Sequence, residues 1–336
     1  MSQDMETFFE DIAVSASLAM ALEASSYPKP GNVHRLKDFK NTNYEHFLAS
    51  AIATEFIFKK AAQAGSDPKI GELLWEAVTK SKQRQTGGNT HFGTFLLILP
   101  LAAAAGMTVK KNPTKKRTSG DVEEICQNAF EICQKTDETD AFCFYKSFEK
   151  LNIPAKKEIE SADFDLSDPT AKNRIKTQQI GLFELMKSAA KRDMIAKEWA
   201  TGFELTNRFS DRLFENNAYF LKNPDKQFKN ALNSAIVLTF LEFMAEFPDT
   251  FIETKFDEKT AERIQKKAKE IIDSSSKSAP EKEIGNKTGN RIDLNRLIPK
   301  INELDDELHA KKINPGSLAD IAAAGIFLAL FRGLTF

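Results

Sequence analysis

The stretch that decides the fold reads NTHFGTFLLILPLAAAAGM and runs from Asn89 to Met107. Its apolar residues recur with the period of a helix, which predicts a helix packed in a core. The apolar part, from Phe95 to Met107, is too short to cross a bilayer. We therefore expect a core helix and no membrane span.

Apolar residues recur with helical period along almost the whole chain, and the alternation typical of strands is scarce. The pattern predicts an all-α fold, a single domain of about a dozen helices. The clearest helices span residues 4–26, 43–64, 69–82, 89–106, 120–134, 137–150, 178–208, 227–247, 258–274, 293–311 and 317–333. Residues 274–290 are rich in Ser, Lys and Gly, so we expect a flexible insertion there.

Composition limits the class of function. The chain has 336 residues with 47 basic and 48 acidic side chains, so its balanced charge gives no reason to expect nucleic acid as a partner. Its three cysteines form no C-x-x-C pair, which argues against a zinc site or a disulfide framework. The first residues are acidic where a signal peptide is basic, so we expect a cytoplasmic protein. The oligomeric state stays open, a homo-oligomer included.

Two polar segments follow or open apolar helices, and each holds a His beside glycines. They are Pro28-Lys29-Pro30-Gly31-Asn32-Val33-His34-Arg35 and Gln85-Thr86-Gly87-Gly88-Asn89-Thr90-His91-Phe92-Gly93. Glycine lets backbone N–H groups approach a ligand, and nearby Lys and Arg supply positive charge. The segments predict a phosphorylated ligand held against helix ends. We assign to it Lys29, Gly31, His34, Arg35, Gly87, Gly88, Asn89 and Thr90.

Capping is the alternative explanation of the second segment, because Thr86 and Asn89 are both good N-cap residues. Capping does not explain Gly93. A glycine inside a helix costs about 1 kcal/mol relative to alanine, so either a ligand or another helix must come close there.

Acidic residues lie on two otherwise apolar helix faces. Glu23 returns to the buried stripe of the first helix, where it either pairs with Lys29 or faces a site as a metal ligand or base. Asp193 falls inside the apolar stripe of the predicted helix over 178–208, and Glu204 continues near it. These two residues either join a ladder of salt bridges or hold Mg²⁺.

The last predicted helix is opened by Asn314-Pro315-Gly316-Ser317-Leu318-Ala319-Asp320. Ser317 and Asp320 have capping-box spacing, which accounts for most of the segment. Capping gives no reason for Asn314, which we count among the ligand-binding residues.

Taken together, these segments resemble the triphosphoribosyl-dephospho-CoA synthase family, in order and through nearly the whole chain. Pro28 to Val33 is similar to the family's P-K-P-G-x-V, Phe47 to Ala51 to its F-x-x-S-A, Asn89 to Gly93 to its N-T-H-x-G, and Pro248 to Thr250 to its P-D-[ST]. The stretch from Lys37 to Tyr44 departs from the family. Asn41 and Asn43 stand where the family has carboxylates, and the stretch holds no His.

The resemblance implies a transferase that moves the 5-triphosphoribosyl group of ATP to the ribose 2′-hydroxyl of dephospho-CoA and releases adenine. Breaking the bond from C1′ to adenine builds oxocarbenium character, which calls for a carboxylate near the sugar and an acid for the leaving base. We expect catalytic roles for Glu23, His91, Asp193 and Asp249, with His91 orienting the sugar or protonating adenine. We expect Mg²⁺ on the triphosphate, with Glu23, Asp193 and Glu204 as candidate ligands.

Two other functions stay open. One is ribosyl transfer in another coenzyme pathway, such as that of a methanopterin-type pterin, which rests on chemical analogy. The other is a non-catalytic nucleotide-binding or scaffold protein, which Asn41 and Asn43 favour. The retained His34, Asn89, His91 and Asp249 argue against the scaffold, because it has little need of exposed His beside glycines.

Overall fold

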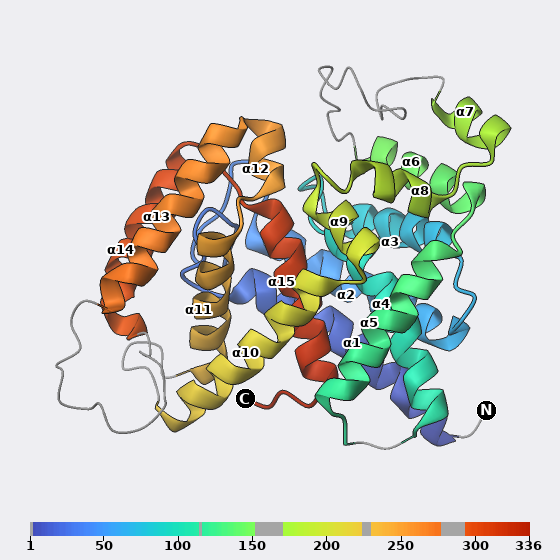
Figure 1. Cartoon of the computed structure of the whole chain (residues 1–336), viewed down its shortest axis with the longest axis horizontal. Coiled ribbons are helices and arrows are strands. Elements are labelled where there is room, and N and C mark those ends of the chain that lie inside the picture. The colour runs from blue at the N-terminus through green and yellow to red at the C-terminus, as the bar shows by residue number, and fades with distance from the viewer. Residues whose placement is uncertain (1–2, 114–115, 152–170, 224–229, 277–292) are drawn as a thin grey trace.

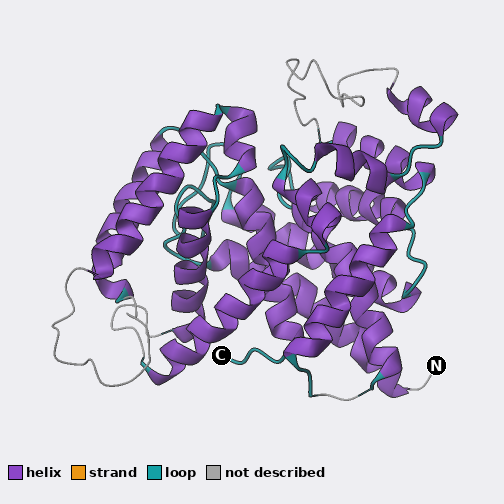
Figure 2. Ribbon diagram, in the orientation of Figure 1, coloured by secondary structure: helices purple, strands orange, loops and turns teal. Residues whose placement is uncertain are grey.

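The computed structural model describes residues 3–113, 116–151, 171–223, 230–276 and 293–336. These residues form fifteen α-helices and no strand (Figure 2), so the all-α prediction is confirmed. The helices are α1 (Gln3–Ser25), α2 (Tyr44–Ala64), α3 (Ile70–Arg84), α4 (Phe92–Lys111), α5 (Ser119–Gln134), α6 (Glu138–Lys150), α7 (Ala171–Gln178), α8 (Leu182–Ala189), α9 (Met194–Thr201), α10 (Glu204–Lys222), α11 (Ala231–Glu246), α12 (Thr250–Lys255), α13 (Glu258–Ser276), α14 (Leu294–Ala310) and α15 (Gly316–Phe331).

The predicted helix over 178–208 is wrong, because the chain breaks twice there into α8, α9 and the start of α10. The side chain of Asp193 accepts a hydrogen bond from the backbone N of Ala196 (2.8 Å) and so caps a new helix. Gly202 then ends α9 in the left-handed conformation, with φ of +74°. Apolar residues continue across both breaks, so their periodicity alone does not reveal them.

The apolar stretch from Phe95 to Met107 lies within α4, whose residues from Phe92 to Gly106 are all buried. By length and composition, α4 is the one helix among the described residues that could cross a membrane, but 89% of its apolar window is buried inside the protein. It packs against α1, α2, α3, α5, α9 and α15. In this structure α4 is therefore the core helix that the sequence predicts.

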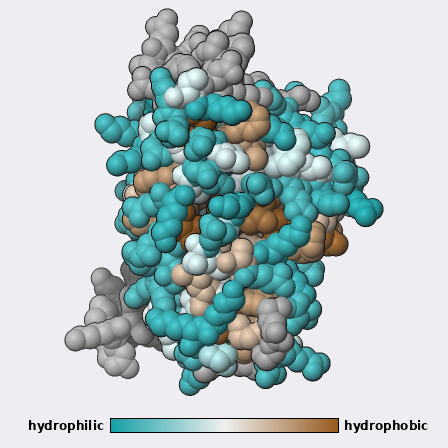
Figure 3. Space-filling model, turned by 90° about the vertical axis from the view of Figure 1, so that its right-hand side faces the viewer, coloured by the Kyte–Doolittle hydropathy of each residue, from teal (hydrophilic) through white to brown (hydrophobic). Residues whose placement is uncertain are grey.

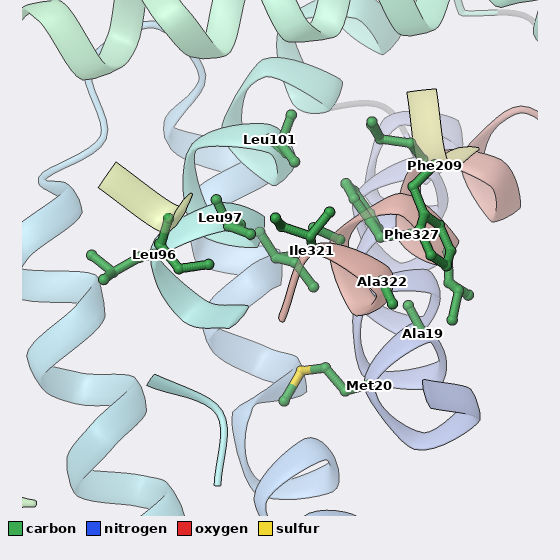
Figure 4. Packing of buried hydrophobic residues seen from close by; sticks show 14 of the residues in the cluster. Ala19, Met20, Leu96, Leu97, Leu101, Phe209, Ile321, Ala322 and Phe327 are labelled. Atoms are coloured by element: carbon green, nitrogen blue, oxygen red, sulfur yellow. The ribbon is translucent and has the colours of Figure 1, made fainter. Parts of the chain in front are cut away.

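The last helix, α15, runs through the middle of the molecule (Figure 1) and contacts α1, α4, α9, α10, α11 and α12. Figure 4 shows its apolar residues Ile321, Ala322 and Phe327 packed among Ala19 and Met20 of α1, Leu96, Leu97 and Leu101 of α4, and Phe209 of α10. Gly325 permits this packing, since a Cβ there would lie 2.6 Å from Cδ1 of Phe209. The start of α15 is thereby fixed against the start of α4.

The buried apolar residues form one cluster that reaches from α1 to α15. Helices α11 to α14 stand on one side of α15, and α1 to α6 lie on the other (Figure 1). The face shown in Figure 3 is mostly hydrophilic, with small separate hydrophobic patches. The three cysteines are free thiols. The predicted insertion over 274–290 begins within α13, and its remainder, from 277, lies outside the described residues.

Candidate active site

Aspartates join the N-terminal ends of α4, α12 and α15. Oδ1 of Asp320, in the first turns of α15, accepts a hydrogen bond from the backbone N of Thr94 in α4 (2.9 Å). Oδ2 of Asp249, which precedes α12, accepts one from the backbone N of Leu318 in α15 (2.8 Å). Each aspartate thus pairs an N–H group that the neighbouring helix cannot pair itself.

The start of α9 completes this helix-start junction. The hydroxyl of Thr250 in α12 accepts a hydrogen bond from the backbone N of Met194 (3.0 Å) and lies 3.2 Å from the hydroxyl of Ser317. The four helix ends therefore lie close together. The backbone N–H groups named above are already paired by Asp249, Asp320 and Thr250. What favours a bound anion at the junction is the partial positive charge of the helix starts.

Asp249 is buried and holds the junction together. Its Oδ1 caps α12 by accepting hydrogen bonds from the backbone N of Phe251 (2.9 Å) and Ile252 (3.0 Å). Burial raises the pKa of Asp249 to about 7, outweighing the N–H groups that lower it. The P-D-[ST] segment therefore has a structural role, whatever its catalytic one.

Asp320 was predicted to cap its own helix with Ser317, and that prediction is wrong. Its Oδ1 serves both the backbone N and the hydroxyl of Thr94, and α15 has no side-chain cap bond. A Cβ on Gly93 would overlap the Asp320 carboxyl group, so the neighbour that requires this glycine is α15, not a ligand. Burial, with the charges of Glu23 and Asp249, raises the pKa of Asp320 to about 7.

The proposed pairing of Asp193 with Glu204 on one helix does not occur. Asp193 precedes α9, whereas Glu204 lies exposed in the first turn of α10. Asp193 is exposed, yet desolvation by the protein around it raises the pKa of its carboxyl, and its charge adds to the raised pKa of Asp249. Among the described residues, no three His, Cys, Asp or Glu side chains form a ready-made metal site.

Glu23 and Lys29 form a buried ion pair, which is the pairing that the sequence left open. Lys29 is 0% exposed and Glu23 is 4% exposed. The Lys29 ammonium bonds both the Glu23 carboxylate and the Glu23 carbonyl oxygen (2.7 Å to the carbonyl). Burial lowers the pKa of Lys29 and raises that of Glu23. Lys29 therefore points inward and away from solvent.

The turn from Pro28 to Arg35 is fixed by Asp305 of α14. Gly31 has a φ of +75° and lies so close to the chain that a Cβ would come within 2.7 Å of the Ile313 carbonyl oxygen. Its N–H donates to Asp305 (2.9 Å), and Nε2 of His34 lies 3.2 Å from the same carboxylate. His34 is buried and its pKa is lowered by that burial, so it is not the exposed His that the sequence suggested. Arg35 is exposed.

The two glycines of the second segment have different surroundings. Gly87 packs against the ring of His46, which leaves no room for a Cβ. Gly88 has a φ of +82° and would place a Cβ in open space. The side chain of Asn89 accepts a hydrogen bond from the backbone N of Phe92 (3.0 Å), so capping explains Asn89. Gly88 is thus the glycine that a ligand can approach.

The departure at Asn41 and Asn43 has a structural explanation at Asn43. Its side chain caps α2 by accepting a hydrogen bond from the backbone N of His46 (3.1 Å), and Nδ1 of His46 accepts one from the backbone N of Asn43 (3.1 Å). Nε2 of His46 lies 3.4 Å from the hydroxyl of Thr86. His46 therefore brings a His to the glycine turn, although the stretch before it holds none.

His91 is 3% exposed and stands where two of the family-like segments meet. Its Nδ1 lies 3.0 Å from the hydroxyl of Ser50, and its ring meets the ring of Phe47 edge to face at 5.1 Å. Both partners belong to the F-x-x-S-A segment. Burial lowers the pKa of His91 to about 3, so the imidazole is neutral at pH 7 and cannot act as an imidazolium acid toward adenine.

Eleven buried side-chain polar atoms among the described residues have no hydrogen-bond partner in the protein, and three of them belong to predicted site residues. They are the hydroxyl of Thr90, Nε2 of His91 and Oδ1 of Asn314. Leaving such atoms unpaired costs roughly 1–3 kcal/mol each, so protein interiors rarely do so without a ligand or solvent to pair them. Thr90 and His91 precede α4, and Asn314 precedes α15. The unpaired atoms therefore border the helix-start junction.

Sequence reasoning missed three residues that organise the site: Asp305, Asp320 and His46. Asp305 falls on the buried apolar face of α14 and Asp320 lies in the apolar helix α15, much as Glu23 lies on the buried face of α1, and this was the available signal. His46 is the third residue of α2, in the capping box with Asn43, and only the folded chain brings it to Gly87.

Known proteins resemble this chain over nearly its whole length. The sequence model of the ATP:dephospho-CoA triphosphoribosyl transferase family matches residues 9–335. A crystal structure from Archaeoglobus fulgidus, of a protein assigned as a triphosphoribosyl-dephospho-CoA synthase, superposes with a TM-score of 0.60 at 26% identity. The match covers 87% of this chain and 100% of that one. No curated protein matches significantly.

Proposed function

Because the chain belongs to the ATP:dephospho-CoA triphosphoribosyl transferase family, we propose that its helix-start junction binds ATP and transfers the 5-triphosphoribosyl group to the 2′-hydroxyl of dephospho-CoA. The observation that carries the proposal is the set of unpaired buried atoms on Thr90, His91 and Asn314. They offer hydrogen bonds to a base and a ribose beside helix ends that favour a triphosphate.

The phosphates belong at the helix starts and at the open backbone of Gly88. Exposed Arg35 is the cation of the first segment that can reach them, since Lys29 is buried against Glu23. Lys29 instead contributes positive charge from within, because its field reaches Asp320 and His91. This assignment replaces direct contact between Lys29 and a phosphate.

Asp193 and Asp249 fit a cation held jointly with phosphate, which leaves Asp320 for proton transfer. Mg²⁺ is usually bound in proteins by one or two carboxylates, with substrate phosphates and water completing its shell. Desolvation raises the pKa of both carboxyls, although Asp193 is itself exposed, and the charge of Asp193 adds to the shift at Asp249. A divalent cation would lower these pKa values, and when bound it would neutralise the charge of the triphosphate.

Asp320 is our choice for proton transfer, in place of His91. Both of its bonds to Thr94 use Oδ1, and Oδ2 packs closely against Gly93 at the start of α4. A carboxyl with a pKa near 7 can exchange protons at neutral pH. The transfer breaks the C1′–N9 bond and forms a bond from C1′ to O2′. The acceptor hydroxyl loses a proton to Asp320, and adenine takes up one.

The test is the release of adenine from ATP with dephospho-CoA present, with mass analysis of the second product. We expect adenine and a product that carries the triphosphoribosyl group. In Asp320→Asn, adenine release should fall by about 100-fold or more, as is typical of a lost acid–base group. The matched control is Asp306→Asn, whose side chain is 74% exposed.

Different outcomes overturn different parts of the proposal. Release of adenine only with another acceptor would remove dephospho-CoA as the substrate. Wild-type turnover in Asp320→Asn would remove Asp320 from the chemistry. ATP that binds but yields no adenine with any acceptor would favour the non-catalytic nucleotide-binding function.

A further inference from the structure

A chain of buried hydrogen bonds leads from the glycine turn to His91. It runs through Gln85, Ser81 and Ser50, which are 5%, 2% and 0% exposed. The atoms in sequence are Gln85 Nε2 to Ser81 Oγ (3.4 Å), Ser81 Oγ to Ser50 Oγ (2.8 Å), and Ser50 Oγ to His91 Nδ1 (3.0 Å). Gln85 and Ser81 lie outside the site described so far, and Ser50 belongs to it only as the hydrogen-bond partner of His91.

The backbone of the glycine turn sets the direction of this chain. The N–H of Gly87 donates to Oε1 of Gln85, and that fixes which end of the amide is oxygen. Nε2 then donates to the carbonyl oxygen of Gly88 (3.0 Å) and to the hydroxyl of Ser81. The Ser81 hydroxyl therefore accepts a hydrogen bond from Gln85 and donates one to Ser50.

The hydrogen bond from Ser81 also bears on the protonation of the imidazole. Ser50 Oγ accepts from Ser81, and His91 Nδ1 is the one acceptor that the described residues pair with this hydroxyl. If Nδ1 carried a proton, the buried Ser50 hydrogen would lack that acceptor, so we take it to be directed at Nδ1. Nδ1 of a neutral ring that accepts a hydrogen bond carries no proton, so the ring proton lies on Nε2. That Nε2 is buried and has no protein partner. The chain thus ends in a buried N–H donor without an acceptor.

We propose that Gln85, Ser81 and Ser50 are positioning residues that hold His91 as the Nε2–H tautomer, with this N–H donating to a ring nitrogen of the departing adenine. The rings of Phe47 and Phe95 pack against the His91 ring at 5.1 and 6.1 Å between centroids, so the donor has apolar, aromatic surroundings of the kind that a planar base favours. A phosphate there would lie against aromatic rings and a neutral donor.

The hydrogen bond assists the departure of the base without proton transfer from His91. As C1′–N9 breaks, its electron pair moves onto adenine, and a donor at a ring nitrogen stabilises the charge that develops. His91 keeps its proton throughout. The inference rests on the proposed function for its substrate, but the tautomer can be observed without turnover.

The test uses protein labelled with ¹⁵N in its histidines, of which the chain has four. The His91 signals are identified by their loss in His91→Gln. In the wild type we expect a pyrrole-type Nε2 and a pyridine-type Nδ1 for His91. In Ser50→Ala we expect a mixture of tautomers. Ser17→Ala is the control, because Ser17 is also buried and bonds the neighbouring carbonyl of Ala51 (2.9 Å) without touching His91.

Kinetics give a second readout. Ser50→Ala should lower kcat for adenine release about tenfold with little change in the KM for ATP, because the donor acts mainly as charge develops. Ser17→Ala should leave both unchanged. Gln85→Glu, of nearly the same shape, removes the N–H groups and should also mix the tautomers, which keeps the test decisive if Ser50→Ala does not fold.

An Nδ1–H tautomer in the wild type would overturn the proposal, as would wild-type tautomer and kcat in folded Ser50→Ala. If the wild type releases no adenine, the proposed function fails, and the tautomer measurement still decides whether the chain of hydrogen bonds acts as described.

Discussion

At the scale of single residues, the pKa of Asp320 has a consequence for stability. The unfolded carboxyl titrates near 3.8, whereas the folded one titrates at about 7. Between these values the folded state holds a proton that the unfolded state lacks. Stability from this group is therefore complete below about pH 4 and is lost as pH rises toward 7.

We predict that Asp320→Asn becomes progressively more stable relative to the wild type as pH rises from 4 to 7, because the amide does not titrate. Denaturant unfolding of both proteins at pH 5 and pH 8 measures this. His91, whose lowered pKa acts in the opposite direction, is present in both proteins and cancels in the comparison. A difference that does not vary with pH would contradict the raised pKa.

The pair of Glu23 and Lys29 yields a second prediction. Lys29→Met leaves a buried carboxyl without its partner, so we expect a loss of about 3–5 kcal/mol in the free energy of unfolding. The double variant with Glu23→Gln should lose less than Lys29→Met alone, because neither charge is then stranded. Denaturant titrations of Lys29→Met, Glu23→Gln and the double variant measure the coupling. Losses that simply add would mean that the pair is not coupled.

At the scale of helices, Gly93 and Gly120 receive the same substitution with opposite expected effects. Gly120 is exposed in the first turn of α5 with space for a methyl group, so Gly120→Ala should stabilise the protein by up to about 1 kcal/mol. Gly93→Ala in α4 would overlap the Asp320 carboxyl, so it should destabilise the protein and reduce adenine release. Thermal unfolding and the adenine assay check both. A neutral Gly93→Ala would mean that α4 and α15 can separate at no cost.

The helices also show how far the sequence can be interpreted. Helix α4 was predictable because a long run of apolar residues with helical period, too short to span a bilayer, is stable only when it is buried in a core. The breaks at Asp193 and Gly202 were not, because an aspartate on an apolar stripe and a glycine in a helix each permit more than one explanation. Whether the Asp193 side chain caps a helix depends on where Thr250 and Met194 meet, and that is a matter of tertiary packing.

At the scale of the molecule, the site joins segments that are distant in the chain. Thr94 and Asp320, 226 positions apart, share a hydrogen bond. The sequence predicted the Pro28–Arg35 and Asn89–Gly93 segments and Asp249 as parts of one site, because a ligand-binding segment has its own local pattern. It did not predict that Asp305 and Asp320 connect them, because nothing in the sequence around a single Asp on a helix indicates which distant residue it will bond.

We predict that ATP with Mg²⁺ protects the first turns of α4, α12 and α15 from hydrogen exchange together, since their N–H groups share one junction. The exposed face of α5 should exchange as before and serves as the internal control. Exchange measured by mass spectrometry with and without nucleotide tests this. Protection confined to α2 and α3 would place the nucleotide elsewhere.

The central position of α15 also bears on how the enzyme is made. Of the helices in the described residues, the ribosome synthesises α15 last, yet Asp320 lies in its first turns and Asn314 directly precedes it. Until residue 316 and those beyond it have emerged, α1, α4 and α10 lack the surface they pack against, and the nascent chain cannot assemble its site. A message that stops short of α15 would thus yield a product that neither folds fully nor consumes ATP.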